Sequence, residues 1–188
     1  MRPRRPGAPL TVQTFAALLR GINVGGRVRI PMAELRETLS SLGLEGVVTY
    51  IQSGNAVFRA PTGDEKAVAA DVERAIHKAF GHDVAVLLRT HEDLVKVERG
   101  TPYPVEGAKP SVHVVFLDEA PAKTAVAGLD PERSPGDEFA VRGREIYLSL
   151  PNGLGRSKLT IDWFERGLGV RATARNWNTL RKLIELTS

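Results

Sequence analysis

The residues best suited to binding chemistry lie in the segment from Arg20 to Pro31, which reads Arg-Gly-Ile-Asn-Val-Gly-Gly-Arg-Val-Arg-Ile-Pro. Glycine is used where φ must be positive or where another group must approach the backbone closely. A loop that exposes backbone N–H groups beside guanidinium groups and ends at a helix N-terminus has the local chemistry of an anion site. This pattern indicates binding rather than a reaction.

Two later segments again place glycine, asparagine and basic residues before an expected helix. Residues 150–159 read Leu-Pro-Asn-Gly-Leu-Gly-Arg-Ser-Lys-Leu, with Ser157 as a candidate N-cap. Residues 171–178 lead into the last helix, where four polar residues recur at helical spacing and would share one face. These four residues are Arg171, Arg175, Asn178 and Lys182. A solvated charged face explains that stripe equally well.

We predict that the basic and glycine-rich segments converge on one ligand-binding face. In the turn 52–55 we interpret Ser53 and Asn55 chiefly as turn residues, and ligand contact by Gln52 and Asn55 is the alternative. The predicted ligand-binding residues are Arg20, Gly21, Asn23, Gly25, Gly26, Arg27, Arg29, Gln52, Asn55, Asn152, Arg156, Lys158, Arg175 and Asn176. We predict no metal ligand and no cofactor, and the sequence identifies no catalytic residue.

Other kinds of chemistry have little support in the sequence. The chain has no cysteine, which excludes disulfides, thiolate nucleophiles and thiolate metal sites. Its four histidines are scattered and form no His-x-x-x-His pair. A nucleophile elbow, a P-loop and a dinucleotide fingerprint are all absent. Asp162 and Glu165 lie one helical turn apart, but that spacing is commonplace on helix surfaces.

The distribution of charge favours a phosphate-bearing partner. The formal net charge is +4, and positive charge is concentrated at both ends of the chain. Residues 1–30 hold six Arg and no acid, residues 31–150 carry a net charge of −6, and residues 151–188 carry +4. If the fold brings the two ends together, they form one positive surface, which is the usual footprint for nucleic acid or phosphate.

The elements that must position these segments follow the same order twice. In the first half we expect strands at 12–19, 47–51, 56–59 and 84–88, one helix from Pro31 to Gly43 and another from Asp64 to Gly81. The second half has a short helix at 92–97, then strands at 112–117, 138–141 and 145–148 and helices at 120–127, 158–168 and 176–186. The last strand of this half is expected to be replaced or followed by the terminal helix.

The order β-α-β-β-α-β is the split arrangement of a ferredoxin-like unit. We therefore predict an α/β (α+β) fold with two ferredoxin-like halves in one compact duplicated unit and a C-terminal helix. The expected divisions are a disordered basic tail at 1–11, a first half at 12–90 and a second half at 91–188. Trp177 lies in the apolar register of the last helix, so its ring should be buried with its indole N–H partnered.

Several of these motifs together resemble a bacterial family known as domain of unknown function 1697. These motifs are Leu18 to Gly26, Ile30 to Met32, Tyr50 to Asn55, Pro151 to Leu159 and Thr173 to Thr179. The resemblance spans roughly Phe15 to Leu186 and implies a duplicated α/β fold of ferredoxin-like character. It implies no activity. The family loop typically has lysines near Arg27 and Arg29, so this chain keeps the charge but presents a planar guanidinium.

Three functional hypotheses remain. The first is a nucleic-acid binder that contacts the backbone, since only Phe15, Tyr50 and Phe58 are available for base stacking. The second is a small enzyme or carrier for a phosphorylated metabolite, with a pocket between the halves clamped by Arg156, Lys158 and Arg175. The third is a structural or partner-binding module. For each of them we expect a monomer in the reducing cytoplasm, without membrane segments.

Overall fold

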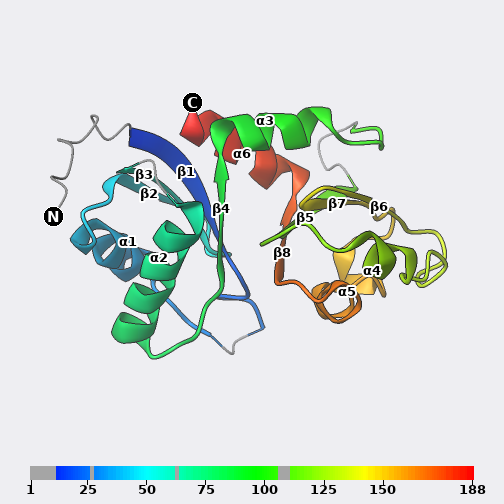
Figure 1. Cartoon of the computed structure of the whole chain (residues 1–188), viewed down its shortest axis with the longest axis horizontal. Coiled ribbons are helices and arrows are strands. Elements are labelled where there is room, and N and C mark those ends of the chain that lie inside the picture. Colours follow the sequence, from blue (N-terminus) through cyan, green and yellow to red (C-terminus); the bar gives the residue numbers. More distant parts are fainter. Residues whose placement is uncertain (1–11, 26–27, 62–63, 106–110) are drawn as a thin grey trace, which may run out of the picture.

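The computed structural model describes residues 12–25, 28–61, 64–105 and 111–188, and they form two four-stranded antiparallel sheets (Figure 1). The first half contains β1 (Val12–Leu19), α1 (Met32–Ser41), β2 (Glu45–Tyr50), β3 (Asn55–Pro61), α2 (Glu65–Phe80) and β4 (Val86–Thr90). The second contains β5 (Val112–Leu117), α4 (Lys123–Ala127), β6 (Glu138–Arg142), β7 (Glu145–Ser149), the 3₁₀ turn η1 (Leu154–Arg156), α5 (Ile161–Leu168) and β8 (Ala172–Asn176). Two further helices, α3 (His91–Arg99) and α6 (Trp177–Thr187), each follow one half.

The strand orders confirm the predicted duplication. The sheets run β2-β3-β1-β4 and β6-β7-β5-β8, so the second repeats the first strand for strand. In each, the central strand pairs with the second strand of the hairpin and with the last strand of the half. This is the ferredoxin-like arrangement that the element order predicts. The exact division of the chain at residues 90 and 91 remains a prediction.

Local chemistry explains where the two crossing helices begin and end. The Asp64 side chain accepts from the Lys66 N–H at the start of α2, and the Thr160 side chain accepts from the Trp163 N–H at the start of α5. Both helices end at a glycine in the left-handed conformation, which an L side chain rarely adopts. The same start and stop signals therefore define corresponding helices in both halves.

The hydrophobic core has three layers, because both central strands are covered on both faces. In β1, Phe15, Ala17 and Leu19 face α1 and α2, whereas Ala16 and Leu18 face the other half of the molecule. In β5, alternate residues likewise face α4 and α5 or the first half. Figure 1 shows α3 and α6 side by side at the top, where they cover the seam between the sheets. Residues 15–19 of β1 and residues 112 and 114–117 of β5 are at most 5% exposed.

The structure corrects three details of the sequence prediction. Ala172–Asn176 is a strand rather than the entry to the last helix. The fifth helix begins after Thr160 and not near Lys158, and the Ser157 hydroxyl accepts from the Leu159 N–H instead of capping a helix. Trp177 is only 1% exposed, as predicted, but its indole N–H has no hydrogen-bond partner among the described residues.

Candidate functional site

The segment after β1 is closed by the side chain of Asn23, which itself has a left-handed backbone with a φ of 56°. Its Nδ2 donates to the Ile30 carbonyl and to the Gln52 carbonyl, both at 2.9 Å, and its Oδ1 accepts from the Ile30 N–H at 2.9 Å. These bonds tie the two ends of the loop together and join the loop to the β2–β3 turn. The Asn23 side chain therefore shapes the site rather than presenting itself to a ligand.

Gly54 makes the contact between this loop and the β2–β3 turn possible. A Cβ at position 54 would lie 2.8 Å from Ile22 Cγ1 and 2.9 Å from Leu19 Cβ, and the φ of +86° is also unfavourable for an L side chain. Gly21 and Gly25 are exposed, with nothing near the position of an added Cβ, so their backbones are open to solvent. Gly26 and Arg27, although predicted as ligand residues, lie outside the described residues.

Arg20 is engaged by the other half of the molecule. Its Nε donates to Glu165 Oε1 at 2.8 Å and its Nη2 donates to Glu165 Oε2 at 2.5 Å and Asp162 Oδ1 at 3.2 Å. Glu165 also accepts from the Ala172 N–H at the start of β8. The two carboxylates one turn apart on α5 therefore hold an arginine across the seam. Arg20 is paired and not available to an anion, contrary to the sequence prediction.

Arg175 is buried in the seam between the halves. All of its donor nitrogens bond to neutral acceptors, so no carboxylate neutralises it among the described residues. The acceptors are Asn55 Oδ1 at 2.5 Å, Thr173 Oγ1 at 2.8 Å and the carbonyls of Ala174 at 2.7 Å and of Leu19 and Gly54 at 2.9 Å. Burial lowers the pKa of Arg175 to about 10, and it stays protonated at neutral pH. Arg175 and Asn55 are structural.

Sequence reasoning missed the counterpart of Arg175, which is Arg89 in β4. Arg89 Nη2 donates to the carbonyls of Leu117 at 2.7 Å and Arg144 at 3.2 Å, and its Nε donates to Glu145 Oε1 at 3.0 Å. Each arginine is the penultimate residue of its strand and is followed by a side-chain cap and a helix. The signal available in the sequence was an arginine directly before a capping residue, Thr90 or Asn176, at the start of an expected helix.

The basic stripe predicted on the last helix does not form. Arg171 precedes β8 and pairs with Asp118 and Glu73, each at 2.9 Å, and Arg175 lies within β8. Asn176 is the N-cap of α6, where its Oδ1 accepts from the Thr179 N–H. Lys182 is on α6 and pairs with Glu185, which raises the pKa of the lysine.

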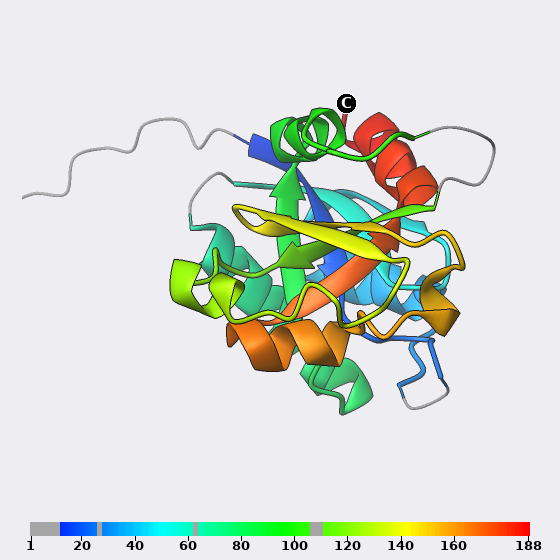
Figure 2. The same ribbon diagram turned by 90° about the vertical axis from the view of Figure 1, so that its right-hand side faces the viewer.

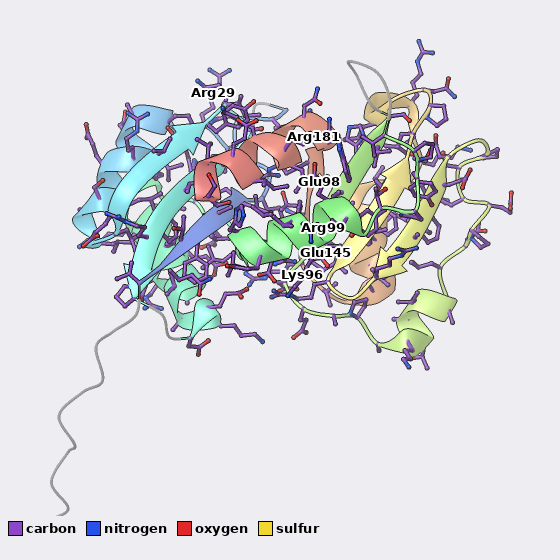
Figure 3. All side chains as sticks on the ribbon, turned by 90° about the horizontal axis from the view of Figure 1, so that it is seen from above. Arg29, Lys96, Glu98, Arg99, Glu145 and Arg181 are labelled. Carbon is purple, nitrogen blue, oxygen red and sulfur yellow. The ribbon has the colours of Figure 1, made fainter. Side chains whose placement is uncertain are left out.

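Three of the predicted basic residues remain exposed and without an ion pair among the described residues: Arg29, Arg156 and Lys158. Figure 2 shows the blue loop after β1 and the gold segment around η1 on the same side of the molecule, although they come from different halves. Gln52 and Asn152 are exposed as well. Figure 3 shows Arg29 at one edge of the molecule, apart from Lys96 and Arg99 on α3. We call the surface formed by residues 20–25 and 28–31, the turn 51–54 and the segment 150–158 the loop face.

The loop face also carries exposed apolar side chains that sequence reasoning did not single out. Val24, Ile51 and Leu154 are 62%, 46% and 40% exposed. Ile51 has a φ of 49°, which is an outlier for a β-branched residue. Such a conformation costs about 1–3 kcal/mol and persists where the surroundings impose it, often at a functional site.

Two cavities lie apart from Arg29, Arg156 and Lys158, although Arg20 lines one of them. A groove of about 810 Å³ lies between α1 and α2 and is lined by residues such as Leu42, Leu44 and Val68. A cleft of about 480 Å³ between the halves is lined by Arg20, Asp118, Glu119, Glu165 and Arg171, whose charges are largely paired with one another. Neither Arg156 nor Lys158 lines this cleft, and Arg175 is buried away from it. In the part of the chain that the structure describes, no group of three or more metal-ligating side chains is found.

The comparisons with known proteins identify a family and a fold but no activity. The sequence model of a family described as "Protein of unknown function (DUF1697)" matches residues 12–147. The solved structure of the conserved bacterial protein SP0830 from Streptococcus pneumoniae is similar, with a TM-score of 0.72 and 22% sequence identity, over 95% of this chain and 100% of that one. No curated protein matches the chain. None of the helices in the described residues has the length and apolar character needed to cross a membrane.

Proposed function

The chain belongs to the DUF1697 family, proteins of unknown function, and we propose from its own geometry that it binds nucleic acid through the phosphate backbone, on the loop face. The observation that carries the proposal is the set of three exposed cations, Arg29, Arg156 and Lys158, on loops that lie on one side of the molecule but come from both halves. An extended ligand such as a nucleic-acid backbone can meet cations on separate loops of both halves. In this proposal the protein acts as a monomer in the bacterial cytoplasm, the reducing compartment that its lack of cysteine favours.

The burial of two of the three candidate aromatic residues supports contact with the backbone rather than recognition of stacked bases on a sheet, and Tyr50 is partly exposed. RNA-recognition modules stack bases on aromatic side chains of the exposed sheet surface. Here Phe15 and Phe58 are 5% and 0% exposed and lie in the core beneath α1 and α2, and the opposite face of the sheet packs against the second half. Backbone contacts position a ligand without reading its sequence, so sequence preference should be weak.

The open backbone beside the cations supports the same proposal. Gly21 and Gly25 are exposed and have no side chain, so phosphate oxygens can approach their backbone atoms closely. Arg29 follows in the same loop and offers a planar guanidinium, which suits bidentate contact with a phosphate.

The salt dependence of binding tests this proposal. If the three cations each meet one phosphate, log K for single strands or duplexes should fall against log salt with a slope near −2 to −3, at ~0.7–0.9 released counterions per contact. The triple variant R29Q/R156Q/K158Q should lose most of this slope, and Arg29→Gln alone should flatten it by just under about one unit. Fluorescence anisotropy of a labelled oligonucleotide at several salt concentrations measures both.

Two control variants separate the loop face from other basic regions. K78Q/R99Q/K123Q removes the same charge from exposed positions on α2, α3 and α4, and should leave the slope unchanged. Arg20→Gln removes an arginine of the same loop that is paired with Glu165, so its effect on the slope should also be small. If replacing Arg2, Arg4 and Arg5 by Gln abolishes binding while R29Q/R156Q/K158Q retains it, the terminal segment and not the loop face binds the ligand.

The phosphorylated-metabolite hypothesis has less support from the geometry. It expects a clamp formed by Arg156, Lys158 and Arg175 around a pocket between the halves. The cleft there is instead lined by four carboxylates and two arginines, most of them already paired. A thermal shift with one phosphorylated metabolite and no binding of nucleic acid would nevertheless favour that function.

A further inference from the structure

The loop face presents apolar side chains beside its cations. Six large hydrophobic side chains are exposed among the described residues, and three of them lie on the three segments of this face. These are Val24 after β1, Ile51 in the β2–β3 turn and Leu154 in η1. Exposed apolar side chains would not contribute to the binding of phosphate alone, because phosphate offers them no apolar contact.

The position of Ile51 is imposed by the local fold. The residue keeps a left-handed backbone that β-branched side chains disfavour, yet its side chain is nearly half exposed and contributes little to the core. The hydrogen bond from Asn23 Nδ2 to the Gln52 carbonyl holds the turn against the neighbouring loop, so that Val24 and Ile51 flank the same contact. Val24 and Ile51 therefore lie on two segments that this hydrogen bond joins, and Arg29 follows Val24 in the same loop.

We infer that the ligand of the loop face is single-stranded rather than duplex nucleic acid, with Arg29, Arg156 and Lys158 on phosphates and Val24, Ile51 and Leu154 on the faces of unpaired bases. This inference rests on the proposed function. A single strand exposes phosphates and apolar base faces alternately along its length, which matches a surface that carries both kinds of side chain. A duplex stacks its base faces inside, and an aliphatic side chain reaches them only by unstacking a base step.

The test compares a labelled single strand with a duplex of the same sequence, in DNA and in RNA, using the full-length protein. The single strand should bind at least about tenfold more tightly than the duplex at equal salt, since only its base faces are accessible. The Ile51→Asn variant should weaken single-strand binding roughly fivefold, and V24S/I51N/L154S should weaken it roughly 50-fold, by the apolar area that no longer becomes buried. The salt slope of both variants should match that of the parent because no phosphate contact is removed.

A matched control uses two aliphatic side chains with similar exposure elsewhere. Val12 is 55% exposed at the opposite end of β1 and Leu42 is 40% exposed at the end of α1, so V12S/L42S should bind like the parent. Asparagine adopts the left-handed conformation readily, so Ile51→Asn should melt at or above the parent temperature, which separates binding from folding.

The possible outcomes separate a failure of the single-strand inference from a failure of the proposed function. Equal affinity for single strand and duplex, or the same affinity for V24S/I51N/L154S and V12S/L42S, would overturn the single-strand inference while leaving the salt-dependent binding of the proposed function intact. Binding of no nucleic acid at all would overturn both. If an acidic protein ligand competes for the same apolar and basic side chains and single strands do not, the surface binds protein and the inference fails.

Discussion

The two halves of the molecule each insert one buried arginine into the other half, but they stabilise its charge differently. Arg175 reaches from β8 to the carbonyl at the end of β1 and to the β2–β3 turn, and Arg89 reaches from β4 to the carbonyl at the end of β5 and to the β6–β7 turn. Arg89 meets a carboxylate there, Glu145, whereas the corresponding position opposite Arg175 is the neutral Asn55.

This difference has an electrostatic consequence. Burial lowers the pKa of both arginines, and for Arg89 the Coulombic attraction of Glu145 opposes that shift. Arg175 depends on neutral hydrogen bonds alone, so it can be held only if every donor finds an acceptor. The two halves of a duplicated fold can therefore keep an arginine at the same position while stabilising its charge by different partners, a carboxylate in one half and neutral acceptors in the other.

The largest difference between the halves should appear at the first residue of the helix that follows each arginine. Trp177 begins α6 and is 1% exposed, whereas His91 begins α3 and is partly exposed beside Thr187. Trp177→Ala should reduce the free energy of unfolding by roughly 3–5 kcal/mol, because it leaves a large cavity between the sheets. Urea denaturation measures the free energy of unfolding, and His91→Ala should lower this free energy by less than about 1 kcal/mol. Similar losses from both variants would contradict this asymmetry.

A second substitution should restore part of the lost stability after Arg89 is replaced, but not after Arg175 is replaced. Arg175→Met and Arg89→Met should each lower the free energy of unfolding by about 3 kcal/mol, because buried acceptors lose their donors. Adding Glu145→Gln should recover roughly 1 kcal/mol in the Arg89→Met background, since it removes a partly buried charge that has lost its partner. Adding Asn55→Ala should recover nothing in the Arg175→Met background, because Asn55 Nδ2 also donates to the Tyr50 carbonyl.

Denaturant unfolding of the parent, the four single variants (Glu145→Gln and Asn55→Ala included) and the two double variants gives these differences as two double-mutant cycles. If Glu145→Gln does not rescue Arg89→Met, the carboxylate contributes no more than a neutral acceptor would, and the electrostatic distinction between the halves disappears.

The smallest effect concerns the response of the second half to acid. His113 in β5 occupies the place that Phe15 occupies in β1, counted from the strand ends Leu117 and Leu19. Burial lowers the pKa of His113 below its usual value. As pH falls through the unfolded-state pKa, the unfolded chain binds a proton first, so the free energy of unfolding decreases. His113→Phe should remove this part of the acid sensitivity between neutral pH and the folded-state pKa.

Urea unfolding at neutral and mildly acidic pH measures the contribution of His113. The same loss of stability on acidification in the parent and in His113→Phe would show that the histidine charges equally well in both states.

Much of the fold was predictable because local signals were strong. Gly81 and Gly169 end helices in the left-handed conformation, and both hairpins have turn residues between strand-like runs. Whether β8 forms was left open, because a five-residue strand containing Ala, Thr, Arg and Asn lacks the β-branched and aromatic content that marks a strand. It is held by pairing with β5, which lies far away in the sequence.

The candidate site was predictable only in part, for a similar reason. Arg20, Arg29 and Arg175 look alike in the sequence, because each lies in a segment that also contains glycine or asparagine. Which of them can meet a ligand depends on whether the other half supplies an acceptor, as Glu165 does for Arg20 and Gly54 and Asn55 do for Arg175. The exposure of Ile51 depends likewise on a turn that Asn23 and Gly54 hold against the neighbouring loop.

The sequence by itself determined the duplicated order of helices and strands, because hydrophobic periodicity, caps and glycines act over a few residues. Only the tertiary structure decided which arginines are exposed, since desolvation and pairing are set by residues more than a hundred positions away, as between Arg175 and Leu19. Arg29, Arg156 and Lys158 stay exposed because no such partner faces them in the described part of the chain.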